Sequence, residues 1–315
     1  MNFSSKRILV AICLTLVLIS GCFPGLEPAG QTPTLDSLRV VAVESFLADI
    51  AQQVAGDAFE VDTLVPYGVD PHVYQPTPKD LAKMAESDVL VMNGGGLESW
   101  ISESLENIEG QRSLIDASDG LPSRKMSEDE IAEHGGDEHT IDPHFWLDPN
   151  LVKQYVTNIR DGFAAADPAR ADKYKTNADA YIQKLTELDA WVKGEIEKIA
   201  PAERILVTNH ESFGYFADRY GFEVIGAIIP SVSSGSSPSA KHLAELIDKI
   251  RESGAKVIFL ETGANPQLAA QIAAETGVKV VNGLASHSLE MSADQAATYL
   301  ELIRHNVRLI VDALQ

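Results

Sequence analysis

Four of the eight histidines in this sequence follow segments that are predicted to be β-strands or ordered turns. In open α/β sheets, ligands bind beyond the carboxyl ends of the strands. Neutral imidazole is a good zinc ligand, and zinc favours four ligands in a tetrahedron. Three or four histidines without thiolates suit zinc better than calcium or magnesium, which prefer oxygen ligands. The candidate metal ligands are His72, His144, His210 and His287.

These histidines are divided evenly between the two halves of the chain. His72 and His144 belong to the first half, and His210 and His287 belong to the second. We therefore expect the set to come together in a cleft between two lobes. His210 is predicted to open a helix, whose positive end would lower the pKa of the ring and keep it neutral for metal binding.

Other residues with possible chemistry have structural interpretations. His242 and His305 fall within predicted helices and are expected to be structural. The glycines at 94–96 follow a predicted strand, but this segment lacks the spacing and the lysine of a phosphate-binding loop. We predict a tight turn there. Packing roles are expected for the three tryptophans, Trp100, Trp146 and Trp191.

The strands and helices that must position the histidines occur twice. Each half has a βαβαβ order, and residues 238–244 echo residues 76–82. Such an order implies a parallel sheet flanked by helices. We therefore predict an α/β fold with two similar parallel-sheet lobes and the metal site in the cleft between them. The predicted strands cover 39–43, 59–65, 88–93, 204–208, 222–228, 256–260 and 278–281.

A long helical pattern at residues 169–199 is predicted to join the two lobes. Apolar residues recur there at three- and four-residue spacing, so one face is predicted to be buried. At 1.5 Å per residue this rigid helix would be roughly 46 Å long. A shorter helix at 150–166 precedes it, with Asp148 as the expected N-cap. The predicted boundaries are an N-terminal lobe at 38–148, linker helices at 149–200 and a C-terminal lobe at 201–315.

The first residues predict a secreted and lipid-anchored protein. Lys6 and Arg7 precede an apolar run at 8–19, which has the length of a signal-peptide core and is too short to span a bilayer. Small residues then precede Cys22, as in a bacterial lipobox. We expect a signal peptide at 1–21, a lipidated Cys22, a polar tether at 22–37 and an extracytoplasmic location on the bacterial cell membrane. An ordinary signal peptide with a chance cysteine is the alternative.

The charge and the cysteines exclude other classes. The formal net charge is −21, from 25 basic and 46 acidic residues. Such a surface repels nucleic acid and favours solubility. Cys13 lies in the expected signal peptide, so the mature chain would keep only Cys22 and have neither a disulfide framework nor a thiolate metal site. We expect a monomer without a nucleic-acid partner.

Nearly the whole mature chain resembles a known family, the zinc and manganese solute-binding lipoproteins of ABC importers, also called cluster A-I metal-binding proteins. The resemblance implies two lobes joined by a rigid helix, with a metal buried between them. It also implies a permease and an ATPase as partners, to which the protein delivers its metal. It rests on residues 65–79, 93–98, 142–149, 210–221, 238–240 and 258–261.

The resemblance also implies a ligand set. His72, His144 and His210 match the first three ligand positions of the family, and manganese members often have glutamate in place of His210. The fourth ligand is usually an aspartate or glutamate near the position of His287, so this chain departs from the pattern there. Either His287 is a fourth nitrogen ligand, or water or another carboxylate completes the site. We expect Zn²⁺ as the transported ion and regard Mn²⁺ as the less favoured alternative.

Zinc members of the family commonly carry a mobile loop, rich in histidine and acidic residues, before the second ligand. Residues 127–140 resemble a short version of this loop, and His134 and His139 lie in it. They could capture metal transiently. The plainer interpretation is a solvated acidic loop.

Two competing functions remain at this point. Three histidines with an open position are also the pattern of a zinc hydrolase. The sequence has no His-Glu-x-x-His helix and no nucleophile elbow, so we predict that the protein is not an enzyme. A surface adhesin or structural lipoprotein, stabilised by metal, is the other alternative.

Overall fold

The computed structural model describes residues 38–124, 141–289 and 297–315, which belong to one unit at 37–315. The predicted signal peptide, the tether and Cys22 lie outside the described residues, as do His134 and His139. No helix within the described ranges is both long and apolar enough to cross a bilayer.

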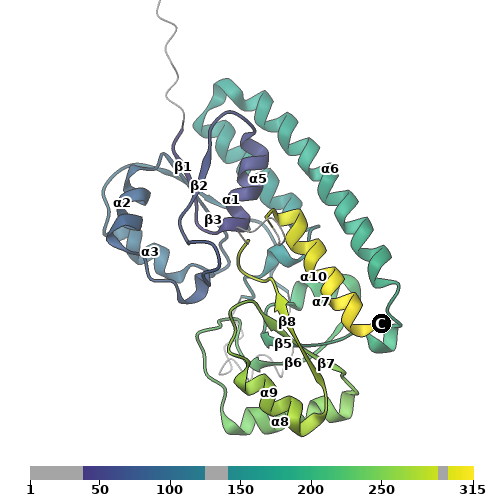
Figure 1. The fold of residues 1–315 in the computed structure, drawn as a ribbon. Coiled ribbons are helices and arrows are strands. Elements are labelled where there is room, and N and C mark those ends of the chain that lie inside the picture. Colours follow the sequence, from purple (N-terminus) through teal and green to yellow (C-terminus); the bar gives the residue numbers. More distant parts are fainter. Residues whose placement is uncertain (1–37, 125–140, 290–296) are drawn as a thin grey trace, which may run out of the picture. The chain divides into compact units, whose positions relative to one another are not determined.

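The first half of the described chain contains one parallel four-stranded sheet (Figure 1). Its strand order is β2-β1-β3-β4, and the helices α1, α2 and α3 connect its strands. The fourth strand was not predicted, because it is short and three of its four residues are exposed. The elements are β1 (Val40–Ala42), α1 (Ser45–Ala55), β2 (Val61–Thr63), α2 (Pro78–Glu86), β3 (Val89–Met92), α3 (Ser99–Glu106) and β4 (Ser113–Asp116).

The second half repeats this arrangement. β5 pairs with β6 and β7 pairs with β8, in both cases in parallel, and β5 lies beside β7. These strands form two two-stranded parallel sheets, β5-β6 and β7-β8. Because β5 lies beside β7, the spatial order β6-β5-β7-β8 corresponds strand by strand to β2-β1-β3-β4. The prediction of an α/β fold with two similar parallel lobes is confirmed. The elements are β5 (Ile205–His210), α7 (Gly214–Tyr220), β6 (Glu223–Ile229), α8 (Ala240–Ser253), β7 (Val257–Glu261), α9 (Pro266–Thr276) and β8 (Lys279–Leu284).

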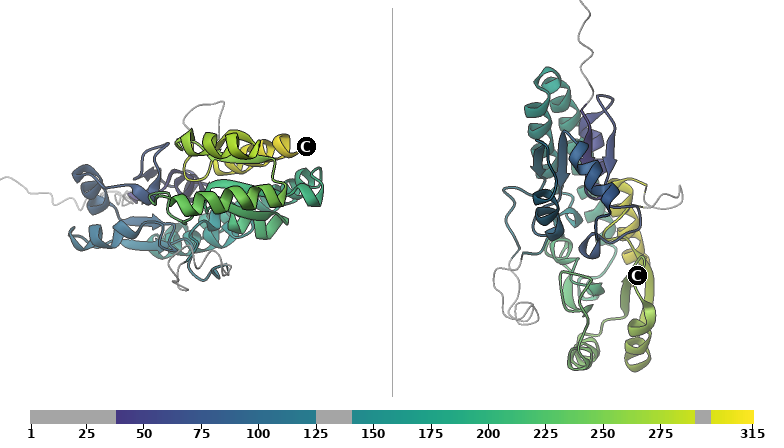
Figure 2. Two further views of the ribbon diagram at one scale, coloured as in Figure 1. Left: turned by 90° about the horizontal axis from the view of Figure 1, so that it is seen from below. Right: turned by 90° about the vertical axis from the view of Figure 1, so that its left-hand side faces the viewer.

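Three further helices connect and support the two halves. α5 (Val152–Ala166) and α6 (Ala171–Ile196) follow the first half, and α10 (Tyr299–Leu314) ends the chain. α6 packs against α1, α5 and α10. In the right-hand view of Figure 2, the purple-to-blue elements of the first half and the green elements of the second occupy separate regions. The linking helices therefore connect two distinct lobes.

The linker helices agree with the predicted pattern but have different ends. The three- and four-residue spacing predicted one buried face for α6. The apolar residues of that face are all buried, from Tyr174 to Val192. α6 begins at Ala171 because residues 168–170 form a separate 3-10 turn. The prediction that Asp148 is the N-cap of α5 is wrong, because that helix begins only at Val152. Instead, Asp148 Oδ1 accepts the Asn150 N–H within the preceding turn, at 2.8 Å.

A buried tryptophan ties the two halves together next to the candidate histidines. Trp146 is fully buried and stacks on Phe46, with ring centroids 4.5 Å apart. Its indole Nε1 donates a hydrogen bond to the Ser286 carbonyl at 2.7 Å, and its own carbonyl accepts one from Tyr299 Oη at 2.7 Å. The segment that carries His144 is thereby fixed against the segment that carries His287.

Two acidic side chains are buried together in the first half. Glu44 and Glu98 are 1% and 4% exposed. The Glu98 carboxylate accepts hydrogen bonds from the backbone N–H groups of Asn93 and Gly94. Burial, together with the neighbouring Glu98, raises the pKa of Glu44 well above its usual range, and burial raises the pKa of Glu98 to about 7. At neutral pH the pair therefore retains a proton that the unfolded chain would release.

We expect Glu44→Gln to stabilise the protein in alkaline solution. Both glutamates ionise at about pH 4.3 in the unfolded chain. The contribution of the pair to stability is therefore complete below that pH and is lost as the pH rises through about 7. A neutral glutamine has no proton to lose and can donate its amide N–H to Glu98. At pH 8 the free energy of unfolding of the variant should exceed that of the unaltered protein by about 1–2 kcal/mol. This corresponds to a factor of about 5–30 in the ratio of folded to unfolded protein.

The measurement is guanidinium unfolding of the metal-free protein at pH 5 and pH 8. Glu60→Gln, which removes an exposed carboxylate, is the matched control. An equal pH dependence in the Glu44→Gln variant and in the unaltered protein would contradict the raised pKa of Glu44.

Candidate metal centre

The four predicted histidines come from four separate segments. His72 lies in a 3-10 turn beyond β2, and His144 directly precedes another 3-10 turn. His210 is the last residue of β5, and His287 lies three residues beyond the end of β8. One ring nitrogen from each histidine lies within 4.8 Å of those of the other three. Tertiary folding thus brings together residues that are up to 215 positions apart in the sequence.

The spacing of the nitrogens suits a small cation. His144 Nε2 lies 3.1 Å from His72 Nε2 and 3.2 Å from His210 Nε2. In a tetrahedral zinc site with Zn–N bonds of about 2.0–2.1 Å, neighbouring nitrogens are roughly 3.3 Å apart. His144 and His210 are fully buried, and His287 is 8% exposed. The cluster therefore has both the dimensions and the seclusion of a metal site.

Carboxylates determine which nitrogen of two rings faces the cluster. His144 Nδ1 lies 2.8 Å from Asp142 Oδ1, and His210 Nδ1 lies 2.6 Å from Glu261 Oε1. An ionised carboxylate only accepts hydrogen bonds, so we assign the ring proton to Nδ1 in both histidines. When both rings are neutral, their Nε2 atoms present lone pairs to each other across 3.2 Å. Two facing lone pairs repel, and a cation between them would turn this repulsion into attraction.

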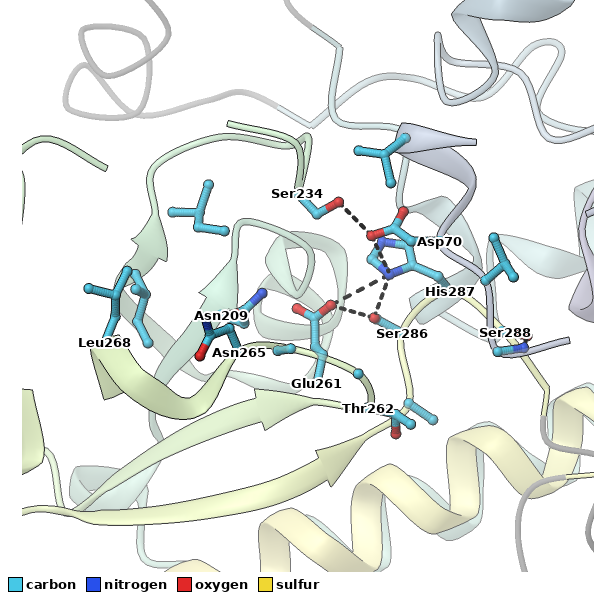
Figure 3. Close-up of a pocket in the computed structure, with 18 residues that line it drawn as sticks. Asp70, Asn209, Ser234, Glu261, Thr262, Asn265, Leu268, Ser286, His287 and Ser288 are labelled. Atoms are coloured by element: carbon cyan, nitrogen blue, oxygen red, sulfur yellow. Dashed lines mark hydrogen bonds and ion pairs between the residues drawn. The ribbon is translucent and has the colours of Figure 1, made fainter. Parts of the chain in front are cut away.

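His287 completes the cluster with an unsatisfied nitrogen. Its Nδ1 lies 2.8 Å from Ser286 Oγ and 3.5 Å from Glu261 Oε2. Figure 3 shows the ring between Asp70, Glu261 and Ser286. Its Nε2 is buried and has no hydrogen-bond partner among the described residues. An unsatisfied buried polar group costs about 1–3 kcal/mol, and coordination to a metal would remove that cost.

The environment keeps most of these rings neutral, which is the state that binds metal. Burial, followed by the charge of neighbouring histidines, lowers the pKa of His72 and His144 well below the usual range. Burial and the charge of His210 lower the pKa of His287 to about 4. Burial also acts to lower the pKa of His210, but the Glu261 carboxylate outweighs it and raises that pKa. In return, despite its own burial, Glu261 has its pKa lowered to about 2 by His210.

The prediction that His210 opens a helix is therefore wrong, and so is the predicted direction of its pKa shift. β5 does not end at Thr208, since Asn209 and His210 continue the strand and His210 pairs with Ile229 of β6. α7 begins only at Gly214. A carboxylate on the neighbouring strand β7, rather than a helix terminus, sets the charge environment of the ring.

Sequence reasoning assigned no role to Asp70, Asp142 and Glu261, although all three contact the histidines. One signal was available, because Asp-Pro-His occurs twice, at 70–72 and at 142–144. In both copies the aspartate Oδ1 accepts the backbone N–H of the histidine, at 2.9 Å and 3.0 Å. The repeated tripeptide thus builds the same local turn on two ligand segments. Glu261 had no comparable signal.

The remaining candidates behave as predicted. His242 Nε2 contacts the Ala227 carbonyl at 2.8 Å, and His305 Nε2 contacts the Gly283 carbonyl at 2.7 Å. Both histidines therefore have structural partners. The three glycines at 94–96 all have positive φ angles, of 82°, 63° and 86°, as the predicted tight turn requires.

Comparison with known proteins agrees with the fold and with a metal-binding role. The family model for "Zinc-uptake complex component A periplasmic" matches residues 40–313. The chain is 32% identical to the high-affinity zinc uptake system protein ZnuA of Bacillus subtilis, over 95% of this chain and 97% of that protein. It is 29% identical to the manganese-binding lipoprotein MntA of Halalkalibacterium halodurans, over 96% of both chains.

A solved structure extends the likeness to three dimensions. The Mn-bound periplasmic metal-binding protein from Candidatus Liberibacter asiaticus is 32% identical, with a TM-score of 0.77. The match covers 88% of this chain and 99% of that one. These relatives are named as metal-binding or metal-uptake proteins, and none of them is named as an enzyme. The chain therefore belongs to the ZnuA family, the periplasmic metal-binding components of metal-uptake complexes.

Proposed function

We propose that this protein captures Zn²⁺ outside the cytoplasm with His72, His144, His210 and His287 and delivers it to the permease of an ABC importer. The observation that carries the proposal is the close approach of the His72, His144 and His210 Nε2 atoms, with His144 Nε2 3.1 Å and 3.2 Å from the other two. The buried and unpartnered His287 Nε2 adds to it. A cation bound by these atoms would satisfy all four rings, and family membership supports the transport role.

The residues around the cluster have distinct roles in this proposal. Asp142 and Glu261 hold their histidines with Nε2 inward, and their negative charges offset the charge of a divalent cation. Ser286 Oγ donates to Glu261 Oε2 at 2.6 Å and so keeps that carboxylate in place. Burial excludes water that would compete for the metal. Because the set is held in advance, binding needs little rearrangement.

The nature of the ligands favours zinc over manganese. The four nearest donor atoms are imidazole nitrogens, which suit zinc, whereas manganese prefers sites with more oxygen. Manganese is the second candidate, because Asp70 and Glu261 lie near His287 and could contribute oxygen. Relatives bear names for either metal, as ZnuA and MntA do.

The attachment and the partners follow from the same proposal. The relative MntA is named a lipoprotein, which supports lipidation of Cys22 and an extracytoplasmic, membrane-anchored location. We further propose the lobe boundaries at 38–148 and 201–315, with linker helices between them. A transient capture role for His134 and His139, and an additional role in adhesion, remain predictions.

Metal titration of the metal-free protein tests the choice of metal. Zn²⁺ and Mn²⁺ are each titrated against a competing chelator of known affinity, and the bound metal is counted by elemental analysis. We expect one tightly bound Zn²⁺ per chain and weaker binding of Mn²⁺. Tighter binding of Mn²⁺ would transfer the proposal to manganese, and no tight binding of either metal would refute it.

A further inference from the structure

A cavity of about 410 Å³ lies beside the histidine cluster. Residues of both halves line it, among them Asp70 from the first and Ser234, Glu261 and His287 from the second. Figure 3 shows these side chains around the cavity, with His287 next to Asp70 and Glu261. The cavity therefore reaches the cluster on the side of His287, whose Nε2 is buried and unpartnered among the described residues.

The three carboxylates around the histidines differ in their access to solvent. The side chains of Asp142 and Glu261 are 1% and 5% exposed, whereas that of Asp70 is 29% exposed. Asp142 and Glu261 each hold a histidine Nδ1 at 2.8 Å or less. Asp70 Oδ2 lies 4.0 Å from His287 Nδ1 and holds no ring at hydrogen-bonding distance. Among these three carboxylates, Asp70 is therefore the one that a cation in the cavity can reach, and its negative charge is not engaged by a histidine ring.

We propose that this cavity is the vestibule through which the cation enters and that Asp70 is the charged group that draws it toward the histidines. This inference rests on the proposed function and adds the route and a residue that controls the rate. A negative charge in a concave, low-dielectric wall concentrates cations locally and raises the association rate. The carboxylate can replace water molecules of the hydrated ion before the imidazoles do. Asp70 is a positioning residue in this scheme and not one of the four ligands.

Local contacts make Asp70→Asn a suitable variant. Asp70 Oδ1 accepts the His72 N–H at 2.9 Å, and Oδ2 accepts a hydrogen bond from Ser234 Oγ across the two halves. An asparagine can keep both contacts, with its Oδ1 as acceptor and its amide N–H as donor to Ser234. The substitution therefore removes the charge and leaves the turn around His72 in place. Ser234→Ala removes the hydrogen bond and leaves the charge.

The experiment is stopped-flow measurement of Zn²⁺ association with the metal-free protein at low and high ionic strength. We expect Asp70→Asn to lower the association rate constant roughly 3- to 10-fold at low salt, and the difference should shrink when salt screens the charge. Binding of one Zn²⁺ per chain should persist. Ser234→Ala, which keeps the charge, should retain the salt dependence of association, and the exposed-site control Glu60→Gln should associate like the unaltered protein.

Two results would overturn the inference while leaving the proposed function intact. One is an Asp70→Asn variant with the unaltered association rate and salt dependence, which would place the entry route elsewhere. The other is a change confined to the dissociation rate, which would make Asp70 a retaining residue. Failure of the unaltered protein to bind Zn²⁺ would instead refute the proposed function itself.

Discussion

Replacement of His144 by alanine is expected to weaken Zn²⁺ binding by about 100- to 1,000-fold. Zinc sites with four protein ligands have apparent binding free energies of about 10–16 kcal/mol. An equal share for each ligand is roughly 2.5–4 kcal/mol, and each 1.4 kcal/mol is a factor of ten in affinity. His144 lies within 3.2 Å of the Nε2 atoms of both His72 and His210. Its loss should therefore open the centre of the cluster.

The measurement is a chelator competition titration, with circular dichroism to verify that the variant is folded. His305→Ala is the matched control, because His305 contacts the Gly283 carbonyl and lies outside the cluster. We expect this control to bind Zn²⁺ with unaltered affinity. Unaltered affinity in the His144→Ala variant would remove His144 from the proposed ligand set and leave the four-histidine site without support.

Replacement of His287 by aspartate is expected to shift the preference from Zn²⁺ toward Mn²⁺ by about 100-fold, or roughly 2.7 kcal/mol. An oxygen donor with a negative charge replaces a neutral nitrogen, and manganese accepts oxygen ligands more readily than zinc does. The new carboxylate would join Asp70 and Glu261, which already lie near this ring. Zn²⁺ should still bind, because three histidines remain.

The measurement is the ratio of Zn²⁺ and Mn²⁺ dissociation constants. His287→Glu, whose side chain is one methylene longer, is the companion variant in case aspartate does not reach the metal. His287→Ala separates the alternatives, since unaltered Zn²⁺ affinity in that variant would mean that His287 is not a ligand. An unaltered ratio in both acidic variants would contradict the role of this position in selectivity.

His287 should gain a proton at a lower pH than an exposed histidine does. An exposed histidine gains a proton near pH 6.5, but burial and the charge of His210 lower the pKa of His287 to about 4. A group with a lowered pKa stays neutral until the pH falls through that value, so His287 remains ready to bind between pH 7 and pH 5.5. We therefore do not expect His287→Asp to flatten the loss of affinity in that range.

Local patterns in the sequence were sufficient for most of the architecture. The strand that includes Val257 and Leu260 is a continuous apolar run because both faces of its sheet are covered. The buried stripe of α6 follows from three- and four-residue spacing. Strand β4 was missed because it lies at the edge of its sheet, where three of its four residues are exposed and no apolar run results.

The residue types and their positions after strands were enough to select His72, His144, His210 and His287, because the connections beyond parallel strands meet at one end of a sheet. The tertiary structure decided the chemistry of each ring. Glu261 lies 51 positions from His210 in the sequence but 2.6 Å from its Nδ1. Burial and such distant carboxylates set the tautomers and pKa values. These depend on which strands become neighbours, and local sequence does not encode that choice.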